Sequence, residues 1–330
     1  MATATRKPQT PWRVSNPAAP AKKRRKPKAD GSVVNSLNGG WGYLFTAPFV
    51  VMFLIFGLAP VVYSVYIAFF SWDPLDMTHT FIGVDNFKRV IADDQFWLAV
   101  RNTFSMWALS TFPQMIMAIA LANVLRNPML KFKTFWRTML LVPNITSVLA
   151  VAIVFGQLFS RDFGLVNLAR EWLGMTDHIN FVSETVPGHI AIATMITWRW
   201  LGYNSLIFLA AMLAVPNELY EAASIDGAGK WRQFVSVTLP GIRNTITFVL
   251  VVGTIGGLQV FAEPLTLSGG ESGGDSRQFS TLTLFLFEQA HMGNWGYAAT
   301  IGIMITFIVL IISAINFFIT KRIASGENQQ

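Results

Sequence analysis

Few groups in this sequence combine the residue types and the spacing that catalysis needs. Glu218 and Glu221 are three residues apart and would share a helix face, as a pair of acid–base carboxylates must. We favour instead a role in which they face solvent or a partner protein. The four histidines are scattered with no helical ligand spacing and the chain has no cysteine, so we expect no metal site.

One glycine-rich stretch partly matches a phosphate-binding loop. Gly229 and Lys230 fit the end of the pattern Gly, four residues, Gly-Lys-Ser/Thr. However, Trp231 stands where the hydroxyl is required, and Ser224 stands where the first glycine belongs. We therefore expect that this chain does not hydrolyse ATP itself, is not an enzyme and carries no cofactor.

Arg199 is informative because it lies inside an apolar stretch. An arginine at the centre of a membrane costs roughly 2.5–3.5 kcal/mol on insertion scales, so its side chain should face protein or water. It could line a cavity, or it could snorkel to the outer interface between Trp198 and Trp200, and the sequence leaves both open. Glu263 also lies outward of the membrane centre, and we adopt its pairing with Arg199 as a hypothesis.

The residues beside Arg199 have the chemistry that a sugar requires. A sugar site needs flat aromatic faces and hydrogen-bonding side chains. Trp200, Tyr203 and Asn204 offer both on one segment.

A second apolar stretch follows with three glycines, Gly253, Gly256 and Gly257. The spacing of four between the first and the last favours close helix packing. The alternative is that the missing side chains leave room for a bulky solute, with Gln259 and Glu263 supplying hydrogen bonds near the outer end.

These residues must be positioned by membrane-spanning helices. The chain is 52% hydrophobic and only 13% charged, unlike a soluble domain. Its apolar stretches predict an all-α membrane protein with six transmembrane helices. We expect either a tilt of the first span or a break near Pro60, and a kink of the second at Pro113. The expected spans are residues 43–70, 103–125, 138–159, 189–213, 244–261 and 295–318.

The basic character of the chain belongs to its start. Residues 1–40 hold nine Lys or Arg against one acid, whereas the remainder holds 16 basic and 17 acidic residues. The composition predicts a disordered tail that attracts anionic membrane lipid, and no nucleic-acid partner. We do not expect a cleavable signal peptide, because the first apolar run is long and no cleavage pattern follows it.

Basic residues also predict the orientation. The loop at 126–137 carries Arg126, Lys131, Lys133 and Arg137 with no acid, and Lys321 begins a short tail at 321–330. The positive-inside rule places these segments and the first tail in the cytoplasm. Six spans require both ends on one side, which agrees.

The loop at residues 214–243, which we call the elbow, falls on the same side. Asn217 is a natural helix cap, and Gly227 can end that helix in a left-handed conformation. A second short helix is expected over 230–239, stopping at Pro240. The elbow alone is typical of an ordinary helical hairpin.

Within the elbow lies a recognisable pattern, Glu221-Ala222-Ala223, Asp226-Gly227-Ala228, Phe234 and Val237-Thr238-Leu239-Pro240. It resembles the EAA loop of binding-protein-dependent ABC transporter permeases. Two further stretches resemble the carbohydrate branch of that family, of the maltose and oligosaccharide type. They are 81–87 with Phe96-Trp97 and Asn102-Thr103, and 135–143 with 163–167.

The resemblance covers nearly everything after residue 41. It implies an ABC importer type I permease fold with a cytoplasmic EAA coupling helix, a permease domain over residues 41–320, and a bacterial inner-membrane location. The implied function is that of a permease subunit for di- or oligosaccharide import. The implied partners are a second permease subunit, two ATP-binding cassette subunits that bind the ATP, and an extracellular sugar-binding protein.

The resemblance also assigns residues to two roles. Coupling to the ATPase would involve Glu218, Glu221, Ala222, Ala223, Asp226 and Gly227. The spans before and after the elbow line the cavity in the sugar permeases. The expected substrate path is therefore Arg199, Trp200, Tyr203, Asn204, Gly253, Gly256, Gly257, Gln259, Val260 and Glu263. Maltose-type permeases place polar side chains where this chain has glycines and Val260, so a partner subunit could carry the direct sugar contact.

Two alternatives stay open. A permease of the same family could carry glycerol phosphate or a polyamine, but the spans show no excess of cations or carboxylates. An intramembrane transferase would need clustered acids, histidines or metal ligands at membrane depth, where only Arg199 and Glu263 are charged.

Overall fold

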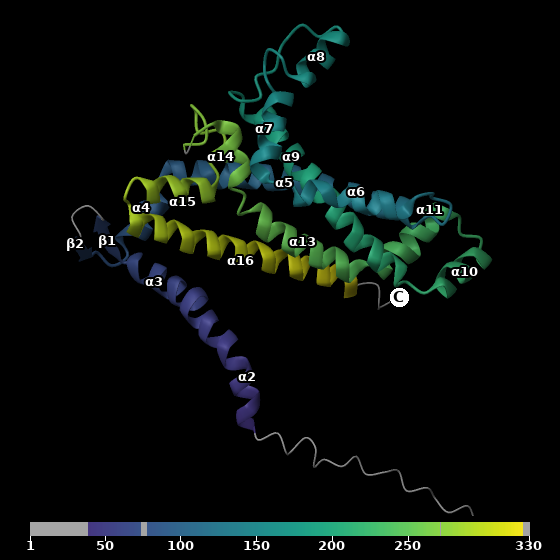
Figure 1. The fold of residues 1–330 in the computed structure, drawn as a ribbon, viewed down its shortest axis with the longest axis horizontal. Coiled ribbons are helices and arrows are strands. Elements are labelled where there is room, and N and C mark those ends of the chain that lie inside the picture. The colour runs from purple at the N-terminus through teal and green to yellow at the C-terminus, as the bar shows by residue number, and fades with distance from the viewer. Residues whose placement is uncertain (1–38, 74–77, 271, 326–330) are drawn as a thin grey trace, which may run out of the picture. The chain divides into compact units, whose positions relative to one another are not determined.

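The computed structural model describes residues 39–73, 78–270 and 272–325. Helices dominate, as the sequence predicts, and the described strands β1 (Phe70–Asp73) and β2 (Thr78–Phe81) pair as one antiparallel hairpin (Figure 1). The chain divides into two compact units, residues 1–59 and 60–330. Most of the predicted basic tail and the end of the last tail lie outside the described residues.

The first unit contains α2 (Gly39–Met52) and a π-helical turn, η1 (Phe53–Leu58). The predicted break near Pro60 is absent, since the helix runs without interruption from Tyr43 to Ile67 through this turn. The N–H of Ala59 donates to the carbonyl of Leu54, five residues back rather than four. The wider turn fits the proline, whose ring and missing N–H disturb the ordinary helical pattern.

Helix α3 (Ala59–Ile67) follows, and from Pro60 onward it belongs to the second unit; the first span therefore ends three residues before its predicted end. The remaining long helices of the second unit are α5 (Asp94–Arg126), α9 (Thr185–Leu213), α13 (Arg243–Gly257) and α16 (Trp295–Ser325). The shorter ones are α4 (Asp85–Ala92), α6 (Lys133–Ile145), α7 (Val148–Leu158), α8 (Leu165–Trp172), α10 (Asn217–Ile225), α11 (Lys230–Gln233), α12 (Leu239–Gly241), α14 (Ala262–Ser268) and α15 (Leu282–His291). A second π-helical turn, η2 (Phe234–Thr238), joins α11 to α12.

Three described helices are long and apolar enough to cross a membrane alone: Tyr43–Ile67, Asp94–Arg126 and Trp295–Phe318. In three further cases two consecutive helices, joined at a bend, are long and apolar enough only when taken together. Counting each bent pair as one span gives up to six spans. The prediction of six spans therefore agrees with the structure only if each bent pair counts as one. The bends are 92° between α6 and α7, 71° between α9 and α10, and 66° between Lys230–Gly241 and α13.

The third span, predicted over 138–159, consists of two helices that meet at a bend. Helix α6 ends at Ile145, Thr146 is extended, and α7 restarts at Val148. Pro143 contributes to this break because it cannot donate a hydrogen bond in the last turn of α6.

Two further predictions need correction after the elbow. The fifth span ends at Gly257 rather than at 261, because two adjacent glycines weaken the helix there. The segment between the fifth and sixth predicted spans, for which no helix was expected, contains α15, whose residues Leu282, Leu284 and Phe285 are fully buried.

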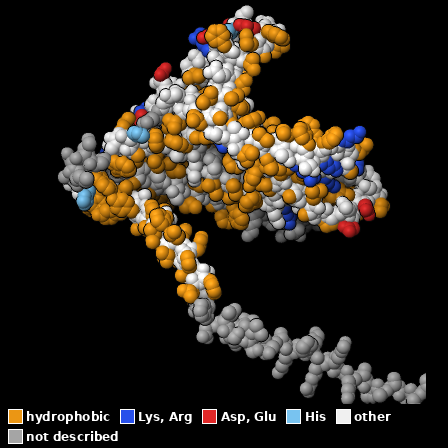
Figure 2. All heavy atoms as spheres, viewed as in Figure 1, with side chains coloured by type: hydrophobic (Ala, Val, Ile, Leu, Met, Phe, Trp, Pro, Cys, Tyr) orange, Lys and Arg blue, Asp and Glu red, His pale blue; other side chains and the backbone are white. Residues whose placement is uncertain are grey.

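The core of the second unit forms where α5 packs along α9. At one end Phe96 of α5 meets Phe285 of α15 and Ile301 of α16. At the other, apolar side chains of α5, α9 and α13 pack together. Figure 2 shows hydrophobic side chains across the visible surface as well, which suits helices that face lipid.

Helix α6 approaches α9 closely at Gly202. A Cβ atom there would overlap the backbone carbonyl of Leu140. We expect Gly202→Ala to force the helices apart and to lower the thermal unfolding temperature of the purified protein by several degrees. Gly156→Ala on α7 is the matched control, since its Cβ would meet open space. Equal melting temperatures for the two variants would contradict this packing.

Candidate functional site

The elbow forms two helices joined by a tight turn. Asn217 was predicted to cap α10, but it is the first residue of that helix; Pro216 occupies the cap position and makes no side-chain cap hydrogen bond. Gly227 has the expected left-handed conformation with φ of 76°. The amide of Gln233 closes the turn, donating to the Ser224 hydroxyl at 2.8 Å and to the Ala228 carbonyl at 2.9 Å. The shape of the elbow is thus held by its own side chains.

The second elbow helix does not stop at Pro240 as predicted. It passes through η2 and ends at Gly241. The N–H of Leu239 donates to the carbonyl of Phe234, five residues back, just as at the π turn before Pro60. The wider turn lets the helix include the proline.

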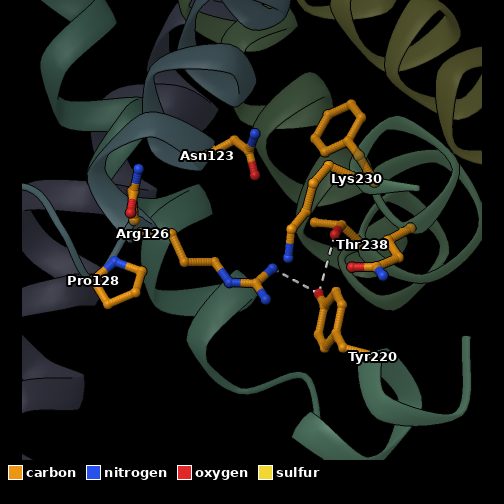
Figure 3. A pocket seen from close by; sticks show the side chains of 9 residues that line it. Asn123, Arg126, Pro128, Tyr220, Lys230 and Thr238 are labelled. Atoms are coloured by element: carbon orange, nitrogen blue, oxygen red, sulfur yellow. Dashed lines mark hydrogen bonds between the residues drawn. The ribbon is translucent and has the colours of Figure 1, made fainter. Parts of the chain in front are cut away.

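Tyr220 ties the elbow to the end of α5. The guanidinium of Arg126 donates to the Tyr220 hydroxyl at 2.7 Å and lies 4.1 Å from the centre of its ring (Figure 3). The same hydroxyl hydrogen bonds to Thr238 at 3.0 Å. Helix α10 is therefore tied to the end of α5 by a hydrogen bond and a cation–π contact.

The outer surface of the elbow combines acidic and apolar side chains. Leu219, Ile225 and Trp231 are large apolar residues that stay exposed, with Ile225 at 87%. Figure 2 shows acidic side chains gathered around α10 and basic ones near α11. Among the expected coupling residues, Ala223 is half-buried, and the exposed ones are Glu218, Glu221, Ala222, Asp226 and Gly227.

Arg199 and Glu263 form the predicted ion pair. The distance between Nη1 and Oε1 is 2.6 Å, and the two side chains are only 15% and 9% exposed. Arg199 lies on α9 and Glu263 on α14, a short helix after α13 rather than part of it. The arginine thus faces protein, with the Glu263 carboxylate as its partner.

The other expected path residues on α9 stay partly accessible. The rings of Trp200 and Tyr203 meet edge to face, with centroids 5.9 Å apart, and the two side chains are 40% and 41% exposed. Asn204 is half-buried beside them in sequence. One turn of α9 therefore presents two aromatic faces and an amide.

The three glycines of α13 were expected either to allow close helix packing or to leave room for a solute, and they differ in this respect. A Cβ atom on Gly257 would lie 2.5 Å from the Trp107 ring on α5, so this glycine permits close packing. Gly253 would make an ordinary contact with Thr111, and Gly256 faces open space. After the helix, Gln259 is exposed, whereas Val260 is buried and its carbonyl accepts a hydrogen bond from Thr281 at 2.9 Å.

Three buried asparagines have roles that sequence reasoning missed. Asn86 donates to the carbonyls of Ala68 and Phe70 at 2.9 and 3.0 Å. Asn102 holds the backbone at Arg277 and Ser280, and Asn167 holds that at Arg161 and Ile179. All three lie in stretches that carried the family resemblance, and each fixes a connecting loop.

A second buried ion pair was also missed. Arg277 makes two hydrogen bonds of 2.7 Å to the carboxylate of Glu288, which is on the buried face of α15. The only signal was an acidic residue within an apolar run. Among the described residues, no group of three or more His, Asp or Glu could hold a metal ion.

Bent and straight apolar helices with buried ion pairs define a polytopic α-helical membrane protein. The chain belongs to the family of binding-protein-dependent transport system inner membrane components, whose model matches residues 114–325. It is therefore a transport protein of the membrane rather than an enzyme. The resemblance to ABC transporter permeases seen in the sequence is confirmed.

Individual relatives cover most of the chain. The lactose transport system permease protein LacF of Rhizobium radiobacter is 32% identical over 284 residues, 85% of this chain and 94% of the relative. The arabinooligosaccharides transport system permease protein AraP of Bacillus subtilis is 34% identical over 278 residues, covering 83% and 86%. Both are named as permeases for carbohydrates.

The fold matches a solved structure. A chain in the crystal structure of a bacterial alginate ABC transporter, in complex with alginate pentasaccharide-bound periplasmic protein, superposes with a TM-score of 0.74. It is 24% identical, and the match covers 89% of this chain and 98% of that one. The predicted ABC importer type I permease fold is confirmed at this level.

Proposed function

We propose that this chain is one of two permease subunits of an ATP-driven importer of neutral di- or oligosaccharides. A second, similar permease completes the translocation pathway, two ATP-binding cassette subunits drive it, and an extracellular binding protein delivers the sugar. The ATP is bound by the partner subunits. The observation that carries the proposal is the elbow, which exposes acidic and apolar side chains while Tyr220 joins it to α5.

The elbow has the properties of a coupling element. Exposed Leu219, Ile225 and Trp231 supply the apolar centre that a stable protein interface needs, and Glu221 and Asp226 supply charges around it. Closure of the ATPase subunits would pull on α10 and move α5 and α9 between inward-open and outward-open states. ATP and the loaded binding protein would each favour one of these states.

Two observations favour an uncharged sugar. The relatives are named for lactose and for arabinooligosaccharides. In this chain Arg199 is neutralised by Glu263, so the expected path keeps no excess charge to select an anion or a polyamine. Trp200 and Tyr203 offer the aromatic faces, with Asn204, Gln259 and the space beside Gly256 completing the surface.

The geometry of the elbow supports a cytoplasmic location for it. Its contact with Arg126 puts it at the same end as the loop 126–137, which is rich in basic residues. The positive-inside rule assigns that end to the cytoplasm, and the predicted N- and C-terminal tails with it.

Transport in proteoliposomes tests the proposal. The complete transporter, containing both permeases and the ATPase subunits, is supplied with its binding protein and radiolabelled lactose or arabinooligosaccharide. We expect ATP-dependent sugar uptake that excess glycerol phosphate and putrescine do not compete away. Uptake of either charged solute in place of every neutral sugar would refute the proposed cargo.

The aromatic face on α9 yields a separate prediction. Trp200→Ala should lower sugar uptake by about fivefold, since a stacked ring contributes on the order of 1 kcal/mol. Trp136→Ala, which removes an indole of similar exposure from α6, is the matched control. Equal sugar uptake by the two variants would contradict the assignment of Trp200 to the substrate path.

A further inference from the structure

A polar cavity lies between the C-terminal end of α5 and the elbow. It has a volume of about 360 Å³. Figure 3 shows side chains entering it from both sides. Its lining is Asn123, Arg126, Asn127 and Pro128 from the α5 side, and Tyr220, Lys230, Gln233, Phe234 and Thr238 from the elbow.

Two cations share this cavity. The ammonium of Lys230 and the guanidinium of Arg126 point into the same space in Figure 3. Among the described residues neither forms an ion pair with a carboxylate, although the elbow carries several acids. Like charges that converge without a counter-charge repel each other, and a bound anion would relieve that repulsion.

The neutral side chains of the cavity are also suited to an anion. Asn127 uses its carbonyl oxygen to accept from the N–H of Met129 at 3.0 Å, which leaves its amide nitrogen as a donor. Asn123 offers a second exposed amide. Arg126 uses one guanidinium nitrogen for Tyr220, so the others remain for a ligand with several acceptor oxygens.

We propose that this cavity binds a phosphate group, carried either by a soluble phosphate or by an anionic lipid headgroup. A phosphate has enough acceptor oxygens for Arg126, Lys230 and the amides together, and its charge matches the two cations. The volume exceeds what inorganic phosphate needs, so the site has room for the rest of an organic phosphate or a headgroup. The bound group would link α5 directly to α11.

Binding to the purified complete transporter tests this inference without measuring transport. One arm measures equilibrium binding of radiolabelled inorganic phosphate at low ionic strength in a zwitterionic detergent. The other compares spin-labelled phosphatidylglycerol with spin-labelled phosphatidylcholine in vesicles that contain both. Saturable phosphate binding indicates a soluble ligand, and a preference for phosphatidylglycerol indicates a headgroup; either result supports the site.

Charge-removing variants locate the binding. Arg126→Gln and Lys230→Gln should each weaken the observed binding by about tenfold, the loss of one charge-assisted contact. Lys131→Gln and Arg232→Gln remove the same charge from neighbouring exposed positions outside the cavity and should change it less than about twofold. Arg126→Lys keeps the charge and should retain part of the affinity, which separates binding from folding.

Two outcomes overturn the inference. One is the absence of both saturable phosphate binding and phosphatidylglycerol preference in the unaltered transporter. The other is an equal loss in all four glutamine variants, because that would mean a diffuse surface field rather than a site. Since transport is not the readout, an importer of another cargo could still pass this test.

Discussion

Glu221→Lys will reduce ATP-dependent sugar uptake by roughly 30-fold or more in the assembled transporter. Glu221 is exposed on α10, between the apolar side chains that we assign to the ATPase interface. Truncating one member of a buried interfacial charge pair costs about 2–5 kcal/mol, and reversing its sign adds repulsion. The measurement is uptake in proteoliposomes together with the ATPase activity that the loaded binding protein stimulates.

The matched control is Lys131→Glu, a charge reversal of equal size in the neighbouring basic loop. It should retain most of the uptake, because Lys131 is exposed and lies outside the elbow. Co-purification of the ATPase subunits should fall for Glu221→Lys only. Full uptake by Glu221→Lys would contradict the assigned role of the elbow.

Arg199→Ala is expected to have the second large effect. It leaves the Glu263 carboxylate, only 9% exposed, without its partner. Breaking one side of a buried ion pair costs about 3–5 kcal/mol. The purified protein should therefore lose thermal stability and uptake together, as measured by a melting curve and by transport.

The partner variant completes a double-mutant cycle. Glu263→Ala should be similarly harmful, whereas Arg199→Ala with Glu263→Ala together should be less harmful than the sum of the two, because no unpaired charge remains. The exposed pair Lys88 and Asp85, 2.8 Å apart, offers a control cycle with a coupling below about 1 kcal/mol. Additive effects at Arg199 and Glu263 would show that the pair does not act as a unit.

Local chemistry predicted the parts of the fold that depend on a few neighbouring residues. Gly227 ends α10 in a left-handed conformation because a residue without Cβ adopts it freely. The ion pair of Arg199 with Glu263 could be predicted because a charge in an apolar helix requires a partner, and few oppositely charged residues were near. The general positions of the spans followed from their apolar length in the same way.

The features that were missed depend on contacts between distant segments. The close approach of α6 to α9 at Gly202 is a property of a packed pair of helices and has no strong local signal. Helix α15 reads as part of a loop because a polar, glycine-rich stretch precedes it. Its position depends on Thr103, whose hydroxyl accepts from the N–H of Leu282 at 2.9 Å.

In the candidate site, too, residue types could be predicted from the sequence, whereas contacts between distant residues could not. Residue types indicated which side chains of α9 could meet a sugar, but only the structure distinguishes Gly257, packed against Trp107, from Gly256, which faces open space. The link from Tyr220 to Arg126 joins residues 94 positions apart and was invisible in the sequence.

Thiol labelling at the elbow tests the central proposal most directly. The chain has no cysteine, so Ile225→Cys introduces a single thiol into it, at a position that is 87% exposed. In the transporter with cysteine-free partners, a membrane-impermeant maleimide should label this thiol in inside-out vesicles but not in intact cells, and the assembled ATPase subunits should protect it. Labelling from outside intact cells, or equal labelling with and without the ATPase subunits, would contradict a cytoplasmic elbow that receives their force.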